Sequence, residues 1–219
     1  MIIAIDGPSG SGKSTLGRML ARELKLLYID TGSMYRAVAL AVIEAHVDPN
    51  DKEAVTALAN KIEIDLEGDA GSLSVLLNGR DITDQIRTES VTEMSSLVST
   101  IPGVRRAMVE RQRVISRRGA VLNGRDIGTV VFPDADVKFF LTAAPEERAE
   151  RRYKEDLISF GSSTTYAETL ADMIERDRRD STRVDSPLRV ADDAIVIDST
   201  GKSIDEVFAE MMANVHRHH

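Results

Sequence analysis

The chain has 219 residues, a formal net charge of −8 at pH 7 and a hydrophobic content of 42%. This length fits one domain with insertions, and the apolar content is enough for a sizeable core. The acidic balance argues against a nucleic-acid surface, and the lack of cysteine excludes disulfides, thiolate zinc sites and thiol nucleophiles.

A strand, a glycine-rich loop and a helix open the chain. The apolar run Ile2–Ile5 predicts a buried strand, and leucine and methionine recur at helical spacing over 16–24. Between them, residues 7–14 match the phosphate-loop pattern G-x-x-x-x-G-K-[ST], whose backbone N–H groups form an anion nest at a helix N-terminus. We expect a nucleoside triphosphate to be bound by Gly7, Pro8, Ser9, Gly10, Ser11, Gly12, Lys13, Ser14 and Thr15. Lys13 should reach the β- and γ-phosphates, and the Ser14 hydroxyl should bind Mg²⁺.

Four later apolar runs also have the length of strands. They are Leu26–Ile29, Ala120–Leu122, Val137–Leu141 and Ala194–Ile197. Helical patterns separate them, at 38–43, 91–98, 104–115 and 207–215, and a Ser203-x-x-Glu206 capping box precedes the last. Alternation of this kind predicts an α/β fold with helices on both faces of a parallel sheet, with ligands at the carboxyl ends of the strands.

Two stretches interrupt the alternation. Residues 62–84 read as a small antiparallel insert, with strands at 62–66 and 73–77, a turn at 68–71 and an Asn78-Gly79 turn. Residues 145–183 carry seven arginines, and Thr165-x-x-Glu168 caps a second helix within them. We interpret this stretch as a helical hairpin that folds over a phosphate site as a lid. An ordinary solvated pair of helices, with ion pairs along each helix, is the alternative.

Three polar segments fall where ligands of such a sheet are expected. Residues 30–36 (DTGSMYR) and 123–129 (NGRDIGT) follow predicted strands, and 176–183 (RDRRDSTR) closes the lid candidate. Arginine outnumbers lysine 21 to 7, and its planar fork suits bidentate phosphate recognition. Together with the phosphate loop, these segments favour transfer between two phosphorylated ligands.

On these motifs the chain resembles the bacterial cytidylate kinases over nearly its whole length. The matching stretches are IDGPSGSGKST, DTGSMYR, GRDIT, IRTE at 86–89, GRDIGTVVFPDA at 124–135, RDRRDSTR and ADDAIVIDST. The resemblance implies a single domain over 1–219 with a P-loop three-layer fold and a five-stranded parallel sheet. It also implies a monophosphate-binding arm at about 31–105, enlarged by the insert at 62–84, and a short helical lid at about 145–183. The implied reaction is direct in-line phosphoryl transfer from Mg-ATP to CMP or dCMP, a step of pyrimidine nucleotide metabolism.

The same resemblance assigns the acceptor side. Arg36, Arg125 and Arg183 would grip the acceptor phosphate and, with Lys13, offset the repulsion between the two anionic ligands as catalytic groups. The cytosine base would be read by Ser96, Arg105 and Asp126, the carboxylate accepting from the C4 amino group. The remaining substrate contacts implied are Arg176 and Asp180 at the sugar, and Thr31 and Tyr35 in the wall of the pocket.

The resemblance leaves one departure and two alternatives. The family often has aspartate where this chain has Asn123, which weakens the expected support for Mg²⁺; Asp30 is either a substitute or a helix cap. A kinase for UMP, AMP or a sugar acid remains an alternative, as does a non-catalytic nucleotide-dependent switch. We expect ATP and CMP or dCMP as partners, no nucleic acid or membrane, and a cytoplasmic monomer.

Overall fold

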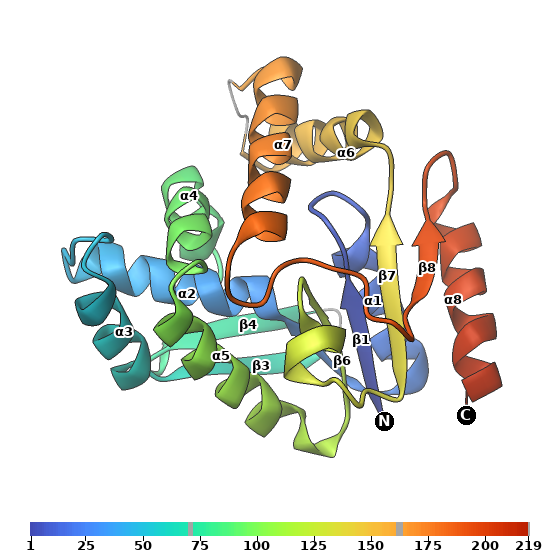
Figure 1. Cartoon of the computed structure of the whole chain (residues 1–219), viewed down its shortest axis with the longest axis horizontal. Helices are drawn as coiled ribbons and strands as arrows, with labels where there is room; N and C mark the ends of the chain where they lie inside the picture. Colours follow the sequence, from blue (N-terminus) through green and yellow to red (C-terminus); the bar gives the residue numbers. More distant parts are fainter. Residues whose placement is uncertain (70–71, 161–163, 219) are drawn as a thin grey trace.

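The computed structural model describes residues 1–69, 72–160 and 164–218, and a five-stranded parallel sheet lies at its centre (Figure 1). The strands are β1 (Ile2–Asp6), β2 (Leu27–Asp30), β6 (Ala120–Gly124), β7 (Val137–Thr142) and β8 (Ile195–Asp198). They lie in the order β2-β6-β1-β7-β8, so β1 and its loop occupy the middle of the sheet. All five strands predicted from the sequence are confirmed.

Helices cover both faces of this sheet because successive side chains of each strand point to opposite sides. Ile3 and Ile5 of β1 pack in one cluster with α1 (Lys13–Leu24) and α8 (Ile204–His218). Ala4 packs in the other cluster with α2 (Thr31–Glu44) and α5 (Pro102–Ile115). The predicted three-layer α/β architecture is therefore confirmed.

The segment between β2 and β6 holds a second, smaller sheet. Besides α2 and α5 it contains α3 (Lys52–Lys61), α4 (Glu89–Val98) and the antiparallel strands β3 (Ile64–Asp69), β4 (Ser72–Leu77) and β5 (Arg80–Asp81). The predicted hairpin is confirmed, and β5 extends it through a two-residue turn in which Asn78 and Gly79 have φ of 50° and 76°. The turn predicted at 68–71 lies partly outside the described residues.

The segment between β7 and β8 is a pair of helices, α6 (Pro145–Phe160) and α7 (Tyr166–Thr182). Thr165 and Glu168 form the predicted capping box of α7, and Ser203 and Glu206 form that of α8. Figure 1 shows both helices beyond the end of the sheet to which the arrow of β7 points, which is the end that bears the phosphate loop. The fold thus brings the arginine-rich helices to the edge where ligands of a parallel sheet bind.

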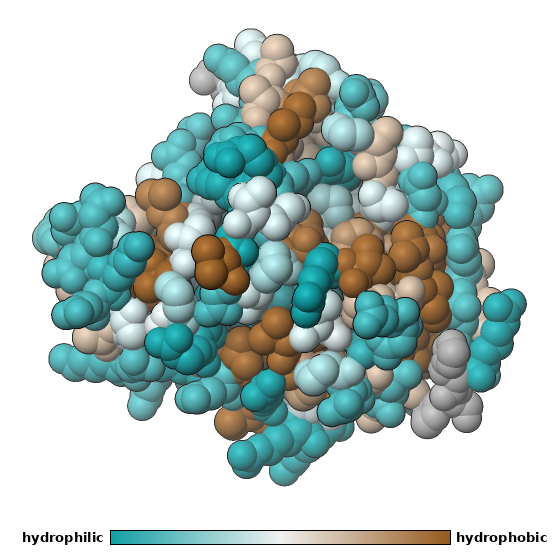
Figure 2. Space-filling model, viewed as in Figure 1, coloured by the Kyte–Doolittle hydropathy of each residue, from teal (hydrophilic) through white to brown (hydrophobic). Residues whose placement is uncertain are grey.

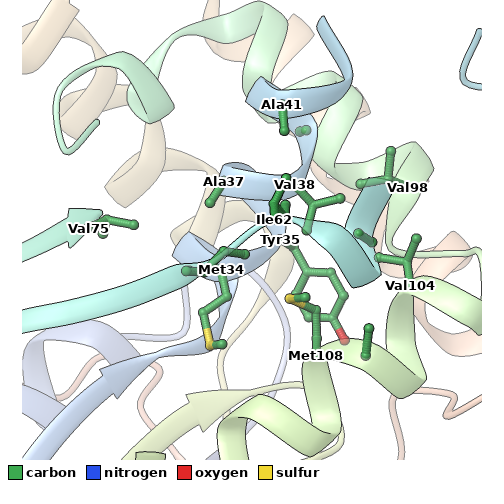
Figure 3. Packing of buried hydrophobic residues seen from close by; sticks show 14 of the residues in the cluster. Met34, Tyr35, Ala37, Val38, Ala41, Ile62, Val75, Val98, Val104 and Met108 are labelled. Carbon is green, nitrogen blue, oxygen red and sulfur yellow. The ribbon is translucent and has the colours of Figure 1, made fainter. Parts of the chain in front are cut away.

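Apolar packing ties the smaller sheet to the central one. In Figure 3 the ring of Tyr35 reaches from α2 toward Met108 of α5, with Val38 and Val104 nearby.

The outer face seen in Figure 2 is mostly hydrophilic at its rim, with brown groups near its middle and toward the β7–β8 side. Within the described residues, no helix combines the length and apolar content needed to span a membrane.

Candidate active site

The phosphate loop is fixed between β1 and α1 by close packing. Gly7, Gly10 and Gly12 have φ of 144°, 74° and 92°, a region that favours glycine. A Cβ on Gly7 would lie 2.0 Å from the Leu141 carbonyl oxygen, and one on Gly10 would lie 2.7 Å from the Arg148 carbonyl oxygen. Glycine at 7 and 10 is therefore required both by conformation and by the approach of β7 and α6.

The ammonium group of Lys13 lies against its own loop. Its Nζ donates to the Pro8 carbonyl oxygen at 2.5 Å and to Ser11 Oγ at 3.4 Å. Burial, and then the nearby guanidiniums of Arg125 and Arg176, lower the pKa of Lys13 well below its ordinary value. Phosphate oxygens at the loop would counter both effects, because they add negative charge beside the buried cation.

A cavity of about 1040 Å³ runs from this loop to the elements of the smaller sheet and α7. On the side expected to bind the phosphoryl donor, the residues that line it are Ser9, Gly10, Gly12, Lys13, Ser14 and Thr15. From the predicted acceptor side it is lined by Thr31, Tyr35, Arg36, Arg105, Arg125, Asp126, Arg176, Asp180 and Arg183. Residues from distant parts of the sequence are therefore brought to one cavity, as the motifs indicated.

A buried ion pair forms one end of the cavity. Arg105 Nη2 donates to Asp126 Oδ2 at 2.5 Å, and the two side chains are 3% and 7% exposed. The Arg105 guanidinium lies over the ring of Tyr35, 5.3 Å from its centroid. Burial raises the pKa of Tyr35 to about 12, so the phenol stays neutral. This end offers a carboxylate, a guanidinium and an aromatic face, which suits a planar ligand with both donors and acceptors.

Three arginines lie close to Asp180 in the cavity wall. Arg125 Nε donates to Asp180 Oδ2 at 2.8 Å, and Arg183 Nη1 lies 3.5 Å from Asp180 Oδ1. Burial, and then the charge of Arg125, lower the pKa of Arg176 to about 10. Burial alone would raise the pKa of Asp180, but the three arginines outweigh it and hold that pKa low.

On two of the arginines expected at the acceptor phosphate, a buried donor atom makes no hydrogen bond among the described residues. These atoms are Arg36 Nε and Arg183 Nη2, the second of which lies 3.8 Å from Asp126 Oδ1. A buried donor without a partner is costly, and an anionic oxygen is the natural partner for a guanidinium N–H. The geometry therefore favours a phosphate group between α2 and α7.

The charge of the cavity is opposite to that of the chain. Among the described residues, eleven Lys and Arg and five Asp and Glu line it, a surplus of six positive charges, whereas the whole chain carries −8. Since a concave, low-dielectric wall concentrates the field of its charges, the cavity attracts small anions.

Asn123 and Asp30 lie at the ends of neighbouring strands beside the phosphate loop. Asn123 Nδ2 donates to Ser14 Oγ at 3.0 Å and to the Tyr28 hydroxyl at 2.9 Å. Asp30 caps α2 by accepting from the Gly32 N–H, and its other oxygen pairs with Arg36 at 3.2 Å. Of the two interpretations of Asp30, the helix cap is therefore confirmed.

The family model for cytidylate kinase matches residues 3–217. The chain belongs to the cytidylate kinase family. A cytidylate kinase of Carboxydothermus hydrogenoformans is 47% identical over 219 residues, covering 99% of this chain and 98% of the relative. One of Halalkalibacterium halodurans is 50% identical over 208 residues, covering 94% and 93%. A crystal structure of an uncharacterized protein from Eubacterium ventriosum resembles the fold, with a TM-score of 0.55, 11% identity and coverage of 99% and 98%.

One residue that the resemblance to cytidylate kinases placed in the site does not line the cavity. Ser96 is half-buried on α4, whereas Thr92, Ser95 and Ser99 form the wall. These three share one side of the helix, and Ser96 is rotated from Ser95 by about 100°. The role of Ser96 at the base stays a prediction, and Ser95 is the buried serine at this wall.

Three residues of the predicted ATP-binding loop also lie outside the cavity wall. Gly7 packs on β7, Ser11 is fully buried with its Oγ donating to the Pro8 carbonyl oxygen, and Pro8 accepts from Lys13. They shape the phosphate loop of this cytidylate kinase fold from behind.

Sequence reasoning missed part of the donor side of the cavity. Lys202 and Ile204, between β8 and the start of α8, line it, and Ile204 lies beside Gly12. Arg18 and Arg151 line it as well. The capping box at Ser203 was the available signal, because it places the start of a helix next to the carboxyl end of a core strand.

Proposed function

We propose that the protein transfers a phosphoryl group from ATP to CMP or dCMP, giving ADP and CDP or dCDP. The observation that carries this proposal is the buried Arg105–Asp126 pair, which faces the phosphate loop across one continuous cavity. Membership of the cytidylate kinase family supports it over nearly the whole chain.

The Arg105–Asp126 end suits cytosine. Asp126 would accept from the C4 amino group, and Arg105 would donate to N3 or O2. Ser95 stands on the same wall, and its hydroxyl can serve either partner. Uracil would present its O4 oxygen to this carboxylate where cytosine presents an amino donor, which disfavours uracil. Adenine also carries an amino donor, so turnover with AMP is what distinguishes the two bases.

Catalysis in this proposal is alignment and electrostatics. The attacking oxygen belongs to a phosphate that is already ionised near neutral pH, so no general base is needed. Arg36, Arg125 and Arg183 would hold the acceptor phosphate against the charge of ATP, and Lys13 would act on the transferred group. Arg36 Nε and Arg183 Nη2, which make no hydrogen bond among the described residues, are donors available for this task.

Magnesium fits the residues beside the phosphate loop. Ser14 lines the cavity, and the neighbouring amide oxygen Asn123 Oδ1 is buried without a hydrogen-bond partner among the described residues. Mg²⁺ takes few protein ligands and keeps several waters and substrate phosphates. Ser14 would hold the ion, Asn123 Oδ1 would accept from one of its waters, and the ion would neutralise phosphate charge.

We infer that residues 31–105 form an acceptor arm and residues 145–183 a lid, within one domain. The supporting observation is that both segments are inserted between strands of the central sheet and that both contribute residues to the cavity wall. Closure would exclude water and prevent hydrolysis of ATP. We propose a monomer, because arms that swing need free space. A cytoplasmic location is also part of the proposal.

A coupled ADP-release assay with Mg-ATP and a panel of CMP, dCMP, UMP, AMP and dTMP tests the function. We expect strong turnover with the two cytidine nucleotides and weak turnover with the others. A Lys13→Met protein prepared in parallel measures contaminating kinase activity. Equal or faster turnover with AMP would reject the base assignment, and slow ATP hydrolysis that ignores all five acceptors would indicate a nucleotide-dependent switch.

A further inference from the structure

Arg148, in the first turn of α6, joins three parts of the molecule. The side chain is buried, and its Nε donates to the Ala143 carbonyl oxygen at 3.0 Å. Its Nη1 donates both to the Ser9 carbonyl oxygen of the phosphate loop at 2.9 Å and to Asp177 Oδ2 of α7 at 2.6 Å. One guanidinium therefore connects the end of β7, the phosphate loop and the second lid helix.

Van der Waals contact reinforces this connection. A Cβ added to Gly10 would lie 2.7 Å from the Arg148 carbonyl oxygen and 3.0 Å from Met173 Cε. The tip of the phosphate loop thus packs against α6 and α7 at once, with no room for even a methyl group. Any displacement of α7 must then move these contacts or break them.

The same helix carries the residues that face the acceptor. Arg176 precedes Asp177 directly, and Asp180 lies one turn further on, where it accepts from Arg125 Nε at 2.8 Å. Both Arg176 and Asp180 line the cavity. Since a helix moves as a rigid unit, the Arg148–Asp177 contact sets the distance of these two side chains from the phosphate loop.

The two oxygens of the Asp177 carboxylate differ in their contacts. Its Oδ1 atom is buried, and no donor reaches it among the described residues, which costs free energy. The Glu175–Arg178 pair on the outer side of α7 differs in this respect, because both side chains are largely exposed, at 47% and 62%, and their atoms lie 2.8 Å apart.

We propose that Arg148 and Asp177 are positioning residues that hold α7 against the phosphate loop. They thereby set the placement of Arg176 and Asp180 toward the acceptor nucleotide. The proposal rests on the proposed function. Filling of the phosphate loop by ATP then restrains α7 through Ser9 and Arg148, and the acceptor side becomes better ordered. ATP and CMP should consequently bind with positive coupling.

The test compares Asp177→Asn with the matched outer variant Glu175→Gln in the full-length protein. Wild type should bind CMP more tightly in the presence of AMP-PNP, measured by titration calorimetry. Asp177→Asn should lose that enhancement and raise the KM for CMP by about tenfold, the effect of one charge-assisted hydrogen bond, while the affinity for AMP-PNP changes little. Asp177→Glu, which keeps the charge, should recover part of the coupling, and Glu175→Gln should match wild type.

Amide hydrogen exchange over α7 supplies a readout that needs no acceptor. AMP-PNP should slow exchange at 173–182 in wild type and in Glu175→Gln, and should fail to do so in Asp177→Asn. A lower melting temperature in Asp177→Asn with wild-type coupling and exchange would overturn the proposal, as would equal effects of the two variants. Absence of CMP turnover in wild type would overturn the proposed function. The exchange measurement would still decide whether Arg148 and Asp177 couple the phosphate loop to α7.

Discussion

Asp6, the last residue of β1, makes the stability of the fold depend on pH. The side chain is 4% exposed, and its two oxygens accept from the backbone N–H groups of Ile127 and Gly128, each at 2.8 Å. Burial raises the pKa of Asp6 from 3.8 to about 6, against the lowering effect of these hydrogen bonds; nearby Asp126 raises it further and Lys13 lowers it. The carboxylate thus ties the segment after Asp126 to the base of the phosphate loop at some cost in stability.

The sign of the pH dependence follows from linkage. Because the pKa of Asp6 is raised on folding, the folded state binds this proton more tightly than the unfolded state does. The stabilisation is fully present below pH 3.8 and is lost as pH rises through about 6. At about 1.4 kcal/mol per pKa unit, the whole effect is about 3 kcal/mol, and the part between pH 5.0 and 7.5 is about 1.4 kcal/mol.

Urea unfolding of wild type and Asp6→Asn at several pH values between 5.0 and 7.5 measures this difference. The free energy of unfolding of wild type, relative to the variant, should fall by about 1.4 kcal/mol across the interval. Asp51→Asn is a suitable control, because Asp51 is exposed and caps α3, a role that asparagine fills equally well. Parallel profiles for wild type and Asp6→Asn would refute the reasoning.

Three further predictions concern the cavity. Lys13→Met should reduce kcat at least about a hundredfold, as for loss of one charged stabilising group. It should not lower the melting temperature, because burial of the ammonium group is unfavourable. Turnover within tenfold of wild type would contradict this. Asp126→Asn should raise the KM for CMP about tenfold, or 1.4 kcal/mol, and leave the KM for ATP nearly unchanged; steady-state kinetics with each substrate varied decides it. Gly10→Ala should lower the free energy of unfolding by roughly 1–3 kcal/mol through strain and overlap with Arg148 and Met173, and urea curves matching wild type would show that the loop can relax.

The central fold was predictable because its strands are short apolar runs buried on both faces. β5 was missed since two residues carry no periodicity, although the Asn78-Gly79 turn before it was recognised. α3 was missed because only Val55 and Ala59 are buried on it, so its apolar stripe is weak. Both omissions occur in the smaller sheet region, where tertiary packing outweighs the local pattern.

The site was predictable where backbone geometry decides it. The phosphate loop follows from its glycines, and Arg36 and Asp126 follow from their places after strand ends. The sequence does not separate Ser95 from Ser96, because adjacent serines are equivalent until packing fixes the rotation of α4. The ion pair between Arg148 and Asp177 could not be predicted either, because it depends on the relative placement of α6 and α7, which residue spacing does not specify.

The segregation of charge has a consequence for how ligands arrive. Because the described lining of the cavity has a net charge of +6, the remainder of the chain has a net charge of −14. Large polyanions therefore meet repulsion at the exterior, while a compact nucleotide that reaches the mouth is drawn inward. Capture of nucleotides should consequently slow as ionic strength rises, because added salt shortens the range over which the arginines are felt.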